Sequence, residues 1–391
     1  MNKNLMVLAG LILSIILLVV LGIKQNHKYS GVRSSLKLVS ATSPQTADIS
    51  GFKRASKDNP IIFPEDFGPH PEYQTEWWYY TGNLITPKGE RFGYQLTFFR
   101  RGLIPPDKVQ TRSSHLAANQ VYMAHFALTD VESKKHHAFE KLARGIGDIA
   151  GARAEPYGVW LEDWIVEELS SGEYRLIASQ DGFGIEIYLK SQKAPVLHGE
   201  QGYSQKSADS GNASHYYSQT RLISEGQITI QNRQYRVSGL SWKDHEYSTS
   251  ALSSSQIGWD WFSIQLDNQY ELMIFQIRDD DGTIDTYSSG TLITPDAEPI
   301  HLSKDEFSIE ILDYWNSPRS KANYSSSWII EVPSQNIKLK IKPYLNDQEM
   351  NVSYTYWEGA VFVSGEQNGE PVSGNGYVEM TGYAGSMAGE F

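Results

Sequence analysis

The sequence predicts an all-β protein built from two antiparallel β domains in tandem. Phe, Trp and Tyr make up 12% of the 391 residues, and aromatic residues favour strands. Short apolar or alternating runs recur between turn signals along most of the chain, whereas the apolar spacing of helices is scarce. A hairpin-like segment at residues 76–84 is echoed at 258–266. This echo indicates a duplicated unit.

The charge distribution separates a basic N-terminal stretch from an acidic remainder. Residues 1–57 carry eight Lys or Arg and one acid, a net charge of +7, so the net −12 of the whole chain leaves −19 for residues 58–391. Binding nucleic acid requires a basic surface that neutralises phosphates, so we expect no nucleic-acid partner. The chain has no cysteine, which excludes disulfides and thiolate metal sites.

The N-terminus contains a candidate membrane helix. Residues Leu5 to Ile23 include no charged side chain, and a run of about 20 apolar residues can cross a bilayer. No Ala-x-Ala-like cleavage site follows, so we predict an uncleaved signal anchor over residues 1–28. Residues 29–59 are rich in Ser, Thr and Lys. They predict a flexible tether whose basic residues can rest on anionic lipid head groups.

The first β domain is expected over residues 60–250. A Pro-rich lead-in precedes an aromatic strand at 75–84, a turn around Pro87, and a second strand at 92–101, which together predict a hairpin. Because alternate residues of a strand share a face, Glu76 and Trp78 point one way. We expect this face of the strand to point inward, so that desolvation raises the pKa of Glu76. Further strands are predicted at 122–130, 159–169, 174–179, 183–189, 216–223, 227–230 and 233–239, with a long loop at 199–215.

The second β domain is expected over residues 255–391. It begins with the echoed hairpin, in which Trp259 aligns with Trp77 and Trp261 with Tyr79. An Asn-Gly turn at residues 368–369 predicts a last hairpin. The remaining strands are predicted at 286–294, 306–314, 326–332, 337–343, 355–365 and 376–383.

The stretch from Gly239 to Leu266 concentrates residues that carry chemistry. It combines aromatic faces, carboxylates and one imidazole, as a pocket for an apolar ligand with acid–base chemistry would. A solvated strand corner would explain the same composition, so both interpretations stay open. The residues concerned are Trp242, Asp244, His245, Glu246, Tyr247, Trp259, Asp260 and Trp261.

Six segments, in order, resemble the carotenoid 1,2-hydratase-like family. This family is also called CrtC/AttH or hydroxyneurosporene synthase-like, and it includes many predicted secreted hydrolases. The resemblance covers about residues 60–388 and implies two lipocalin-like (calycin-type) β-barrel domains. The segments are Glu76-Trp-Trp-Tyr, Ala124-His-Phe-Ala, Trp242-Lys-Asp-His-Glu, Gly258-Trp-Asp-Trp-Phe, Tyr356-Trp-Glu-Gly-Ala-Val and Gly376-Tyr-Val-Glu-Met-Thr-Gly-Tyr.

The resemblance also implies a site. An Asp-His-x-Trp element of the carotenoid hydratases maps onto Asp244, His245 and Tyr247, with Tyr in place of Trp. A Tyr-x-Asp element should fall near residues 272–276, where Gln276 stands in place of the acid. This departure separates the chain from the carotenoid hydratases and brings it nearer the secreted-hydrolase branch.

We therefore expect a protein that binds an apolar, lipid-like or isoprenoid molecule between its two β domains, with Asp244, His245 and Tyr247 as catalytic residues of a hydratase. One alternative is a non-catalytic lipocalin-like carrier, and another is an accessory subunit of an ABC transporter. We expect no cofactor and no metal, because the histidines are scattered and no His-Glu-x-x-His segment occurs; a Gly-x-Ser-x-Gly segment is also absent. The expected ligand-binding residues are Glu76, Trp78, His125, Trp242, Trp259, Asp260, Trp261, Gln276, Trp357 and Glu358.

Topology gives the first testable prediction. Basic residues after the apolar run favour a cytoplasmic body, but the resemblance to secreted proteins favours export, and we predict the latter. Protease added to intact spheroplasts should cut between Tyr29 and Lys57 and release a folded β body. Cleavage seen only after lysis would show that the body is cytoplasmic.

Overall fold

The computed structural model describes residues 49–109, 118–209, 211–249 and 252–387. Within these residues the chain consists of β-strands and four short 3₁₀ turns, which confirms the all-β class. No described helix is long and apolar enough to cross a membrane. The predicted anchor helix lies outside the described residues. The 3₁₀ turns are Glu65–Phe67, Pro106–Lys108, Lys304–Glu306 and Pro333–Gln335.

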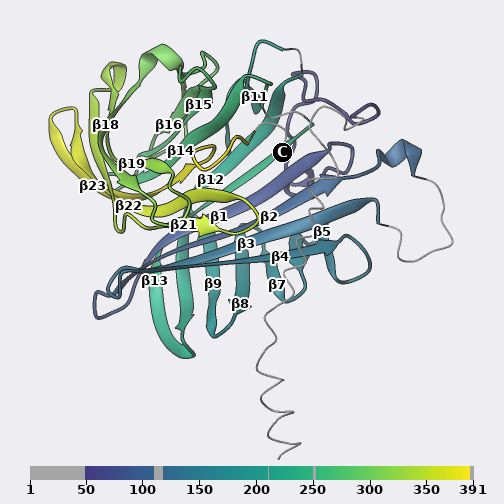
Figure 1. Cartoon of the computed structure of the whole chain (residues 1–391), viewed down its shortest axis with the longest axis horizontal. Helices are drawn as coiled ribbons and strands as arrows, with labels where there is room; N and C mark the ends of the chain where they lie inside the picture. Colours follow the sequence, from purple (N-terminus) through teal and green to yellow (C-terminus); the bar gives the residue numbers. More distant parts are fainter. Residues whose placement is uncertain (1–48, 110–117, 210, 250–251, 388–391) are drawn as a thin grey trace, which may run out of the picture. The chain divides into compact units, whose positions relative to one another are not determined.

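The first sheet nearly closes into a barrel. Its main path runs β4-β3-β2-β1-β13-β12-β9-β8-β7-β6-β5, all neighbours antiparallel, and β10 and β11 pair with β12. Strand β6 approaches β2, β3 and β4, which brings the two ends of the path together (Figure 1). Its strands are β1 (Thr75–Ile85), β2 (Arg91–Gly102), β3 (Gln120–Asp130), β4 (Lys135–Arg144), β5 (Ala150–Arg153), β6 (Gly158–Leu161), β7 (Trp164–Ser170), β8 (Glu173–Gln180), β9 (Phe183–Ser191), β10 (Val196–Leu197), β11 (Tyr203–Gln205), β12 (Ala213–Ile230) and β13 (Arg233–Ser248).

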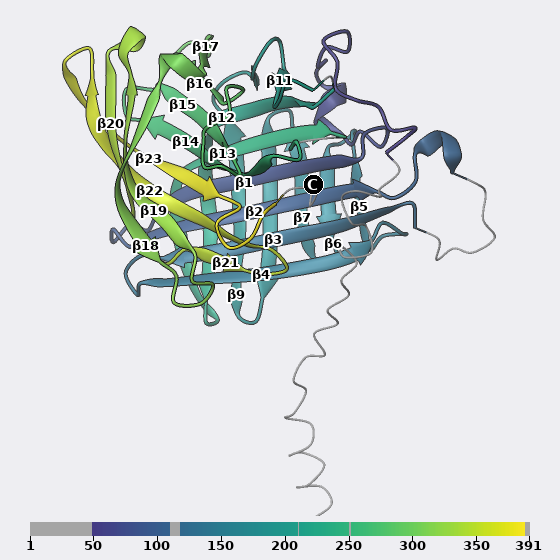
Figure 2. The ribbon, with the colours of Figure 1, turned by 45° about the horizontal axis from the view of Figure 1, so that its top comes forward.

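The second sheet forms a half-barrel. Its path runs β17-β16-β15-β14-β23-β22-β20-β19-β18, and β21 pairs with β22 (Figure 2). Its strands are β14 (Gln256–Leu266), β15 (Glu271–Asp279), β16 (Ser289–Ile293), β17 (Pro299–Ser303), β18 (Ser308–Asn316), β19 (Asn323–Val332), β20 (Ile337–Pro343), β21 (Glu349–Asn351), β22 (Thr355–Gln367) and β23 (Glu370–Met380).

Several strand predictions differ from the structure. The last strand, β23, begins at Glu370, six residues before its predicted start, and the predicted loop 199–215 contains β11. The run 159–169 is divided into β6 and β7 by a turn at Glu162, which takes a φ of 56°. The runs 216–223 and 227–230 are one long strand, β12. Strand β13 continues through Ser248, nine residues past its predicted end. The Asp-His-Glu segment is therefore the middle of a buried strand, and the solvated-corner interpretation is wrong.

Each sheet has its own apolar core, and a third cluster joins them. The first barrel is filled by large side chains such as Trp78, Tyr80 and Trp164. The half-barrel packs around residues such as Trp328 and Trp357. Between the sheets lie Tyr79, Trp242 and Trp261 with other apolar groups. The echoed hairpins meet here, because the aligned residues Tyr79 and Trp261 contact edge to face with ring centroids 5.2 Å apart.

An ion cluster fastens one side of the junction. Glu271 of the second sheet is fully buried. It pairs with Lys193 at 2.7 Å and with Arg221, both from the first half of the chain. Lys193 also donates to the carbonyls of Gln269 and Thr294. The two cations thus compensate the buried carboxylate, as burial of a charge requires, and the two carbonyls accept the remaining hydrogen bonds of Lys193.

The two sheets lie close together at Gly93 on β2. A Cβ built there would lie 2.6 Å from the Cβ of Ala360 and 3.3 Å from the hydroxyl of Tyr377. No side chain can enter this position unless the two sheets separate.

We predict that Gly93→Ala lowers the free energy of unfolding by about 1–3 kcal/mol, the usual cost of overpacking. Thermal and urea unfolding measure it. The matched control is Gly385→Ala, where an added Cβ meets nothing within 4 Å. Equal stability of the two variants would contradict the close approach.

Candidate functional site

The central strand β13 presents alternate side chains to two different environments. Cross-strand pairing sets Tyr79 against Asp244 and Trp78 against His245. Tyr79 belongs to the junction cluster and Trp78 to the barrel core. Because paired residues share a face, Asp244 points to the junction and His245 into the barrel. The structure therefore does not form the expected Asp244–His245 pair.

A cavity of about 80 Å³ lies at the junction, partly open to solvent. Its walls are mainly aromatic and apolar, and several carboxyl groups and one lysine reach it. The volume of the cavity is about half that of an engineered apolar cavity of roughly 150 Å³ that holds benzene, so a larger ligand would have to extend through the open side. This junction pocket is lined by Trp77, Tyr79, Thr97, Phe99, Lys206, Tyr216, Asp244, Glu246, Leu252, Trp259, Trp261, Phe275, Ile277 and Glu379.

Asp244 is a buried carboxyl held by three donors. Its oxygens accept from Trp242 Nε1 at 2.6 Å, from the Tyr216 hydroxyl at 2.8 Å and from the Ser218 hydroxyl. Ser218 Oγ is in turn 2.6 Å from His198 Nε2. Burial raises the pKa of Asp244 to about 7, although the three hydrogen bonds oppose the rise. The group can therefore exchange a proton near neutral pH.

Glu379 supplies a second carboxyl to the pocket from β23. Trp259 Nε1 donates to its Oε2 at 2.9 Å. Burial raises the pKa of Glu379 to about 7, and the charges of Asp244 and Glu246 add to the rise. Glu379 pairs across the strands with Glu358.

Glu358 is fully buried behind the pocket wall. It accepts from the Tyr79 hydroxyl at 2.6 Å, and its Oε2 has no hydrogen-bond partner among the described residues. Burial, and then the charge of Glu379, raise its pKa well above the usual range. Burial therefore favours the uncharged form of Glu358.

Inside the first barrel, Glu76 is the centre of a different cluster. It is fully buried, which confirms its inward orientation. Burial acts to raise its pKa, but Arg100, His245 and His70 outweigh burial and hold the pKa well below the usual range. The expected rise is wrong because a close guanidinium and two imidazoles favour the carboxylate.

The same cluster brings together three groups that could ligate a metal. His70 Nδ1, Glu76 Oε1 and His245 Nε2 lie within 4.8 Å of one another. However, Glu76 Oε1 is hydrogen-bonded directly to both rings, at 2.8 and 2.9 Å. Asp66 contacts the other nitrogen of His70 at 2.8 Å. Because both ring nitrogens of His70 contact carboxylates, His70 is better placed to be an imidazolium in an ion network than a metal ligand.

Together with Glu76, three more predicted site residues therefore lie on the barrel side of β13, away from the junction pocket. His245 donates to Glu76 and accepts from the Tyr217 hydroxyl at 2.9 Å, and burial lowers its pKa to about 4. Trp78 stacks on His245 with centroids 5.0 Å apart. Tyr247 stacks on His70 at 3.6 Å.

Lys243 shows how completely the first barrel is filled. Its Nζ has no hydrogen-bond partner among the described residues. It lies 4.3 Å from the ring centroid of Tyr157 and 4.8 Å from that of Tyr174. Burial lowers its pKa to about 7. Aromatic faces take the place of a counter-ion here.

Two more predicted residues face the half-barrel. Asp260 contacts Arg278 at 3.3 Å and the Tyr383 hydroxyl at 3.1 Å, and Gln276 is its cross-strand partner. The pocket-facing residues of β15 are instead Phe275 and Ile277. No acid of β15 reaches the pocket.

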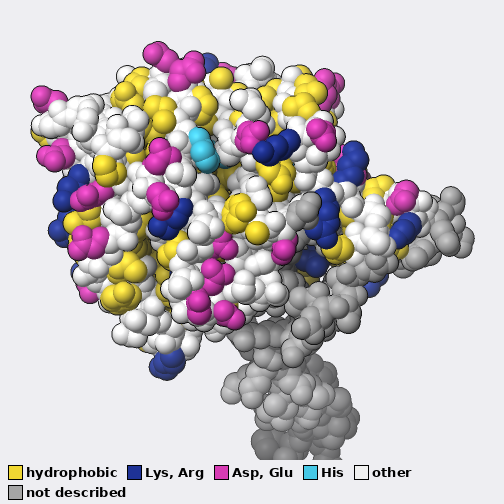
Figure 3. Space-filling model, turned by 90° about the horizontal axis from the view of Figure 1, so that it is seen from above, with side chains coloured by type: hydrophobic (Ala, Val, Ile, Leu, Met, Phe, Trp, Pro, Cys, Tyr) yellow, Lys and Arg dark blue, Asp and Glu magenta, His cyan; other side chains and the backbone are white. Residues whose placement is uncertain are grey.

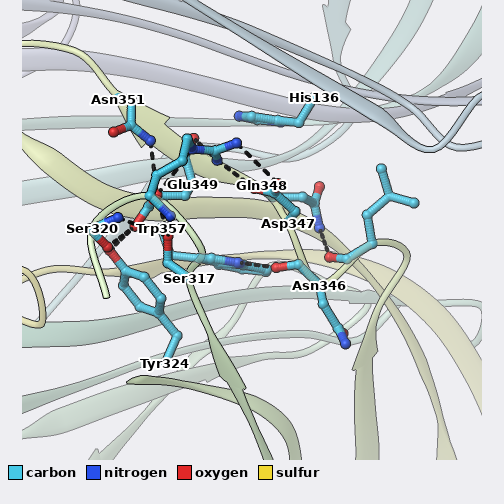
Figure 4. A network of polar contacts seen from close by, with 12 residues as sticks. His136, Ser317, Ser320, Tyr324, Asn346, Asp347, Gln348, Glu349, Asn351 and Trp357 are labelled. Carbon is cyan, nitrogen blue, oxygen red and sulfur yellow. Dashed lines mark hydrogen bonds and ion pairs between the residues drawn. The ribbon is translucent and has the colours of Figure 1, made fainter. Parts of the chain in front are cut away.

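The last two predicted residues lie on other contacts. Trp357 is a core residue whose Nε1 donates to the Asn346 carbonyl at 2.7 Å, beside the polar network of Glu349 (Figure 4). His125 bonds the Tyr356 hydroxyl at 2.8 Å and Glu140 at 3.2 Å. It joins β3 of the first sheet to β22 of the second.

Of the predicted site residues, Asp244, Trp259 and Trp261 line the pocket, and Trp242 and Glu358 support its wall. Sequence reasoning missed Glu379, Lys206 and Tyr216. Glu379 stands in one of the segments that carried the family resemblance, and its alternation with core residues Val378 and Met380 was the signal available. Lys206 and Tyr216 lacked such a signal, because they lie in or near the predicted loop.

On the face shown in Figure 3, acidic, basic and apolar side chains are interspersed, so this face shows no single charged field.

Fold and site together define a lipocalin-like protein of two β units with an acid-bearing apolar pocket at their junction. The AttH-like family model matches residues 54–383, and the chain belongs to this family. It resembles the crystal structure of an AttH from Nitrosomonas europaea, with 34% identity and a TM-score of 0.76 over 85% of this chain and 99% of that one.

A second solved structure is similar in fold. Kievitone hydratase from Nectria haematococca has a TM-score of 0.64 at 16% identity, over 86% of this chain and 97% of that one. A search of curated proteins finds no match.

The barrel cluster predicts a pH dependence of stability. Burial acts to lower the pKa of His70, but hydrogen bonds to Asp66 and Glu76 raise it from 6.5 to about 9. A group whose pKa is higher in the folded than in the unfolded protein stabilises the fold. The stabilisation is complete below the unfolded-state pKa and is lost as the pH rises through the folded-state pKa. The stability advantage of wild type over His70→Gln should therefore shrink by on the order of 2–3 kcal/mol between about pH 6 and pH 10.

Urea unfolding across this pH range measures the effect. His301→Gln is the control, because His301 is an exposed residue of β17. An advantage over His70→Gln that is independent of pH would show that His70 is not an imidazolium in the folded protein.

Proposed function

We propose that the junction pocket binds an apolar isoprenoid or lipid-like molecule and adds water to one of its double bonds. The observation that carries this proposal is the pair of carboxyl groups, Asp244 and Glu379, whose pKa values burial raises to about 7 beside aromatic walls. Hydration of an isolated alkene requires an acid that is neutral before it donates its proton.

Glu379 is the better proton donor of the two. Among the described residues, the Trp259 indole is the one donor to its carboxyl group, at Oε2, so Oε1 can carry a proton. Asp244 has three donors, which favour its ionised form. We therefore assign Glu379 as the acid and Asp244 as the base.

The reaction balances with these two groups. The proton of Glu379 adds to one alkene carbon, and the π electrons form the new C–H bond. The cation left on the other carbon lies against the faces of Trp77, Trp259 and Trp261, which stabilise positive charge. Water bonds to that carbon and gives one proton to Asp244. Asp244 then releases this proton to the solvent, and the solvent returns one to Glu379, so the net reaction is addition of one water. His245 has no part in this scheme, because it points into the barrel.

A non-catalytic carrier is the second candidate. The residues that β15 presents to the pocket are Phe275 and Ile277. The resemblance to the carotenoid hydratases implied an acid in this part of the chain, so its absence from the pocket-facing positions of β15 favours a carrier. Large side chains fill the first barrel, so a carried lipid would also occupy the junction. Native mass spectrometry of protein purified with lipid extract distinguishes the two: an unmodified lipid supports carriage, and a product heavier by one water supports hydration. Export, membrane anchoring and association with an ABC transporter stay predictions.

Variants test the assignment of acid and base. Glu379→Gln and Asp244→Asn should each lower turnover of a panel of isoprenoid alkenes by about 10²–10⁴-fold, the usual contribution of a proton-transfer group. Asp260→Asn is the matched control, since Asp260 is a buried carboxyl on the opposite face of β14. Wild-type activity in either pocket variant would overturn the role of that residue.

The two assignments also predict the pH profile. Activity should fall below about pH 7, where Asp244 becomes protonated, and above about pH 7, where Glu379 ionises. The measured values belong to the coupled pair. A profile that rises continuously with pH would exclude an acid-catalysed step.

A further inference from the structure

Lys206 introduces a positive charge into the wall of the junction pocket. The residue is 8% exposed and lies between β11 and β12. Its Nζ is 3.1 Å from Glu246 Oε1. The same nitrogen lies 4.1 Å from the ring centroid of Phe275 and 5.3 Å from that of Tyr216. Both rings line the pocket with it.

The ammonium group has more donors than its partners use. A lysine carries three N–H donors, and Glu246 is the carboxylate paired with it in the described residues. Glu246 also accepts from the Ser214 hydroxyl. The aromatic faces attract the charge but do not replace a hydrogen-bond acceptor.

A ligand made only of hydrocarbon would be poorly suited to this wall. It would displace water from Lys206 and offer no acceptor in return, and an unmade hydrogen bond of a charged group is costly. A ligand oxygen would restore the lost bond. Glu246 already neutralises Lys206, and no other Lys or Arg is found among the described residues that line the pocket. A neutral oxygen therefore suits the site better than an anion.

We propose that Lys206 forms an oxygen-binding subsite of the junction pocket, so that the ligand is an isoprenoid bearing a carbonyl or hydroxyl group and not a pure hydrocarbon. This inference rests on the proposed function, since it names the substrate class of the same pocket. Glu246 is two residues from Asp244 on one face of β13, a spacing of roughly 7 Å in a strand. The oxygen therefore lies a few carbon atoms from the reacting double bond.

Binding of two matched probes tests the subsite. Sulcatone is a small isoprenoid ketone, and 2-methyl-2-heptene is the hydrocarbon with the same carbon skeleton. Binding is followed by tryptophan fluorescence, because Trp77, Trp259 and Trp261 line the pocket, and by calorimetry. The quantity measured is the ratio of the two dissociation constants.

Wild type should bind the ketone more tightly than the hydrocarbon. Lys206→Met should weaken ketone binding about tenfold, as expected for loss of one charge-assisted hydrogen bond, and leave hydrocarbon binding within about twofold. The double variant Lys206→Met, Glu246→Gln should bind both probes as Lys206→Met does. This result would show that the effect comes from loss of the subsite and not from the unpaired charge of Glu246. Lys88→Met, at an exposed turn lysine, should keep the wild-type ratio.

The outcomes distinguish the inference from the proposed function. Binding of both probes with the same ratio in wild type and Lys206→Met would overturn the oxygen subsite and leave the apolar pocket standing. Binding of neither probe would overturn both. Selective loss of ketone binding in both Lys206 variants supports the subsite, whether or not turnover is detected.

Discussion

Strand β13 is the structural constraint on which both halves of the molecule depend. It is hydrogen-bonded to β1 and β12, so it is a wall of the first barrel, and its other face is covered by the second sheet. The pleat alternates its side chains between these two environments. Neighbouring residues Asp244 and His245 consequently belong to separate clusters with different partners. A shift of one residue in register would exchange the two sets and place an imidazole and a lysine in the pocket.

The two clusters show how burial can have opposite effects on carboxyl groups of one protein. Glu76 is hydrogen-bonded to Arg100 and to two imidazoles, and these groups compensate its negative charge. Glu379 has an indole N–H and neighbouring acids, so burial is the larger effect. One carboxyl stabilises the fold as an anion, and the other is available for proton transfer. The distinction depends on neighbours supplied by distant strands.

The duplicated hairpin gives the pocket its shape. Trp77 and Tyr79 from the first copy face Trp259 and Trp261 from the second, and all four line the cavity. This arrangement buries aromatic surface that neither sheet could bury alone. The close contact at Gly93 and the ion cluster of Glu271 hold the sheets near each other. Formation of the pocket is thus a consequence of the packing of the two sheets.

The sequence by itself determined the all-β class, the duplication and the family, because these depend on local alternation, turn residues and ordered motifs. It also predicted that Glu76 points inward and that the aromatic residues near 259–261 belong to a pocket. Only the tertiary structure decided in which carboxyls burial raises the pKa, that His245 lies away from the pocket, and that Glu379 and Lys206 enter it. A pKa and a pocket wall depend on groups that are far apart in the chain, and local pattern carries no information about which of those groups meet.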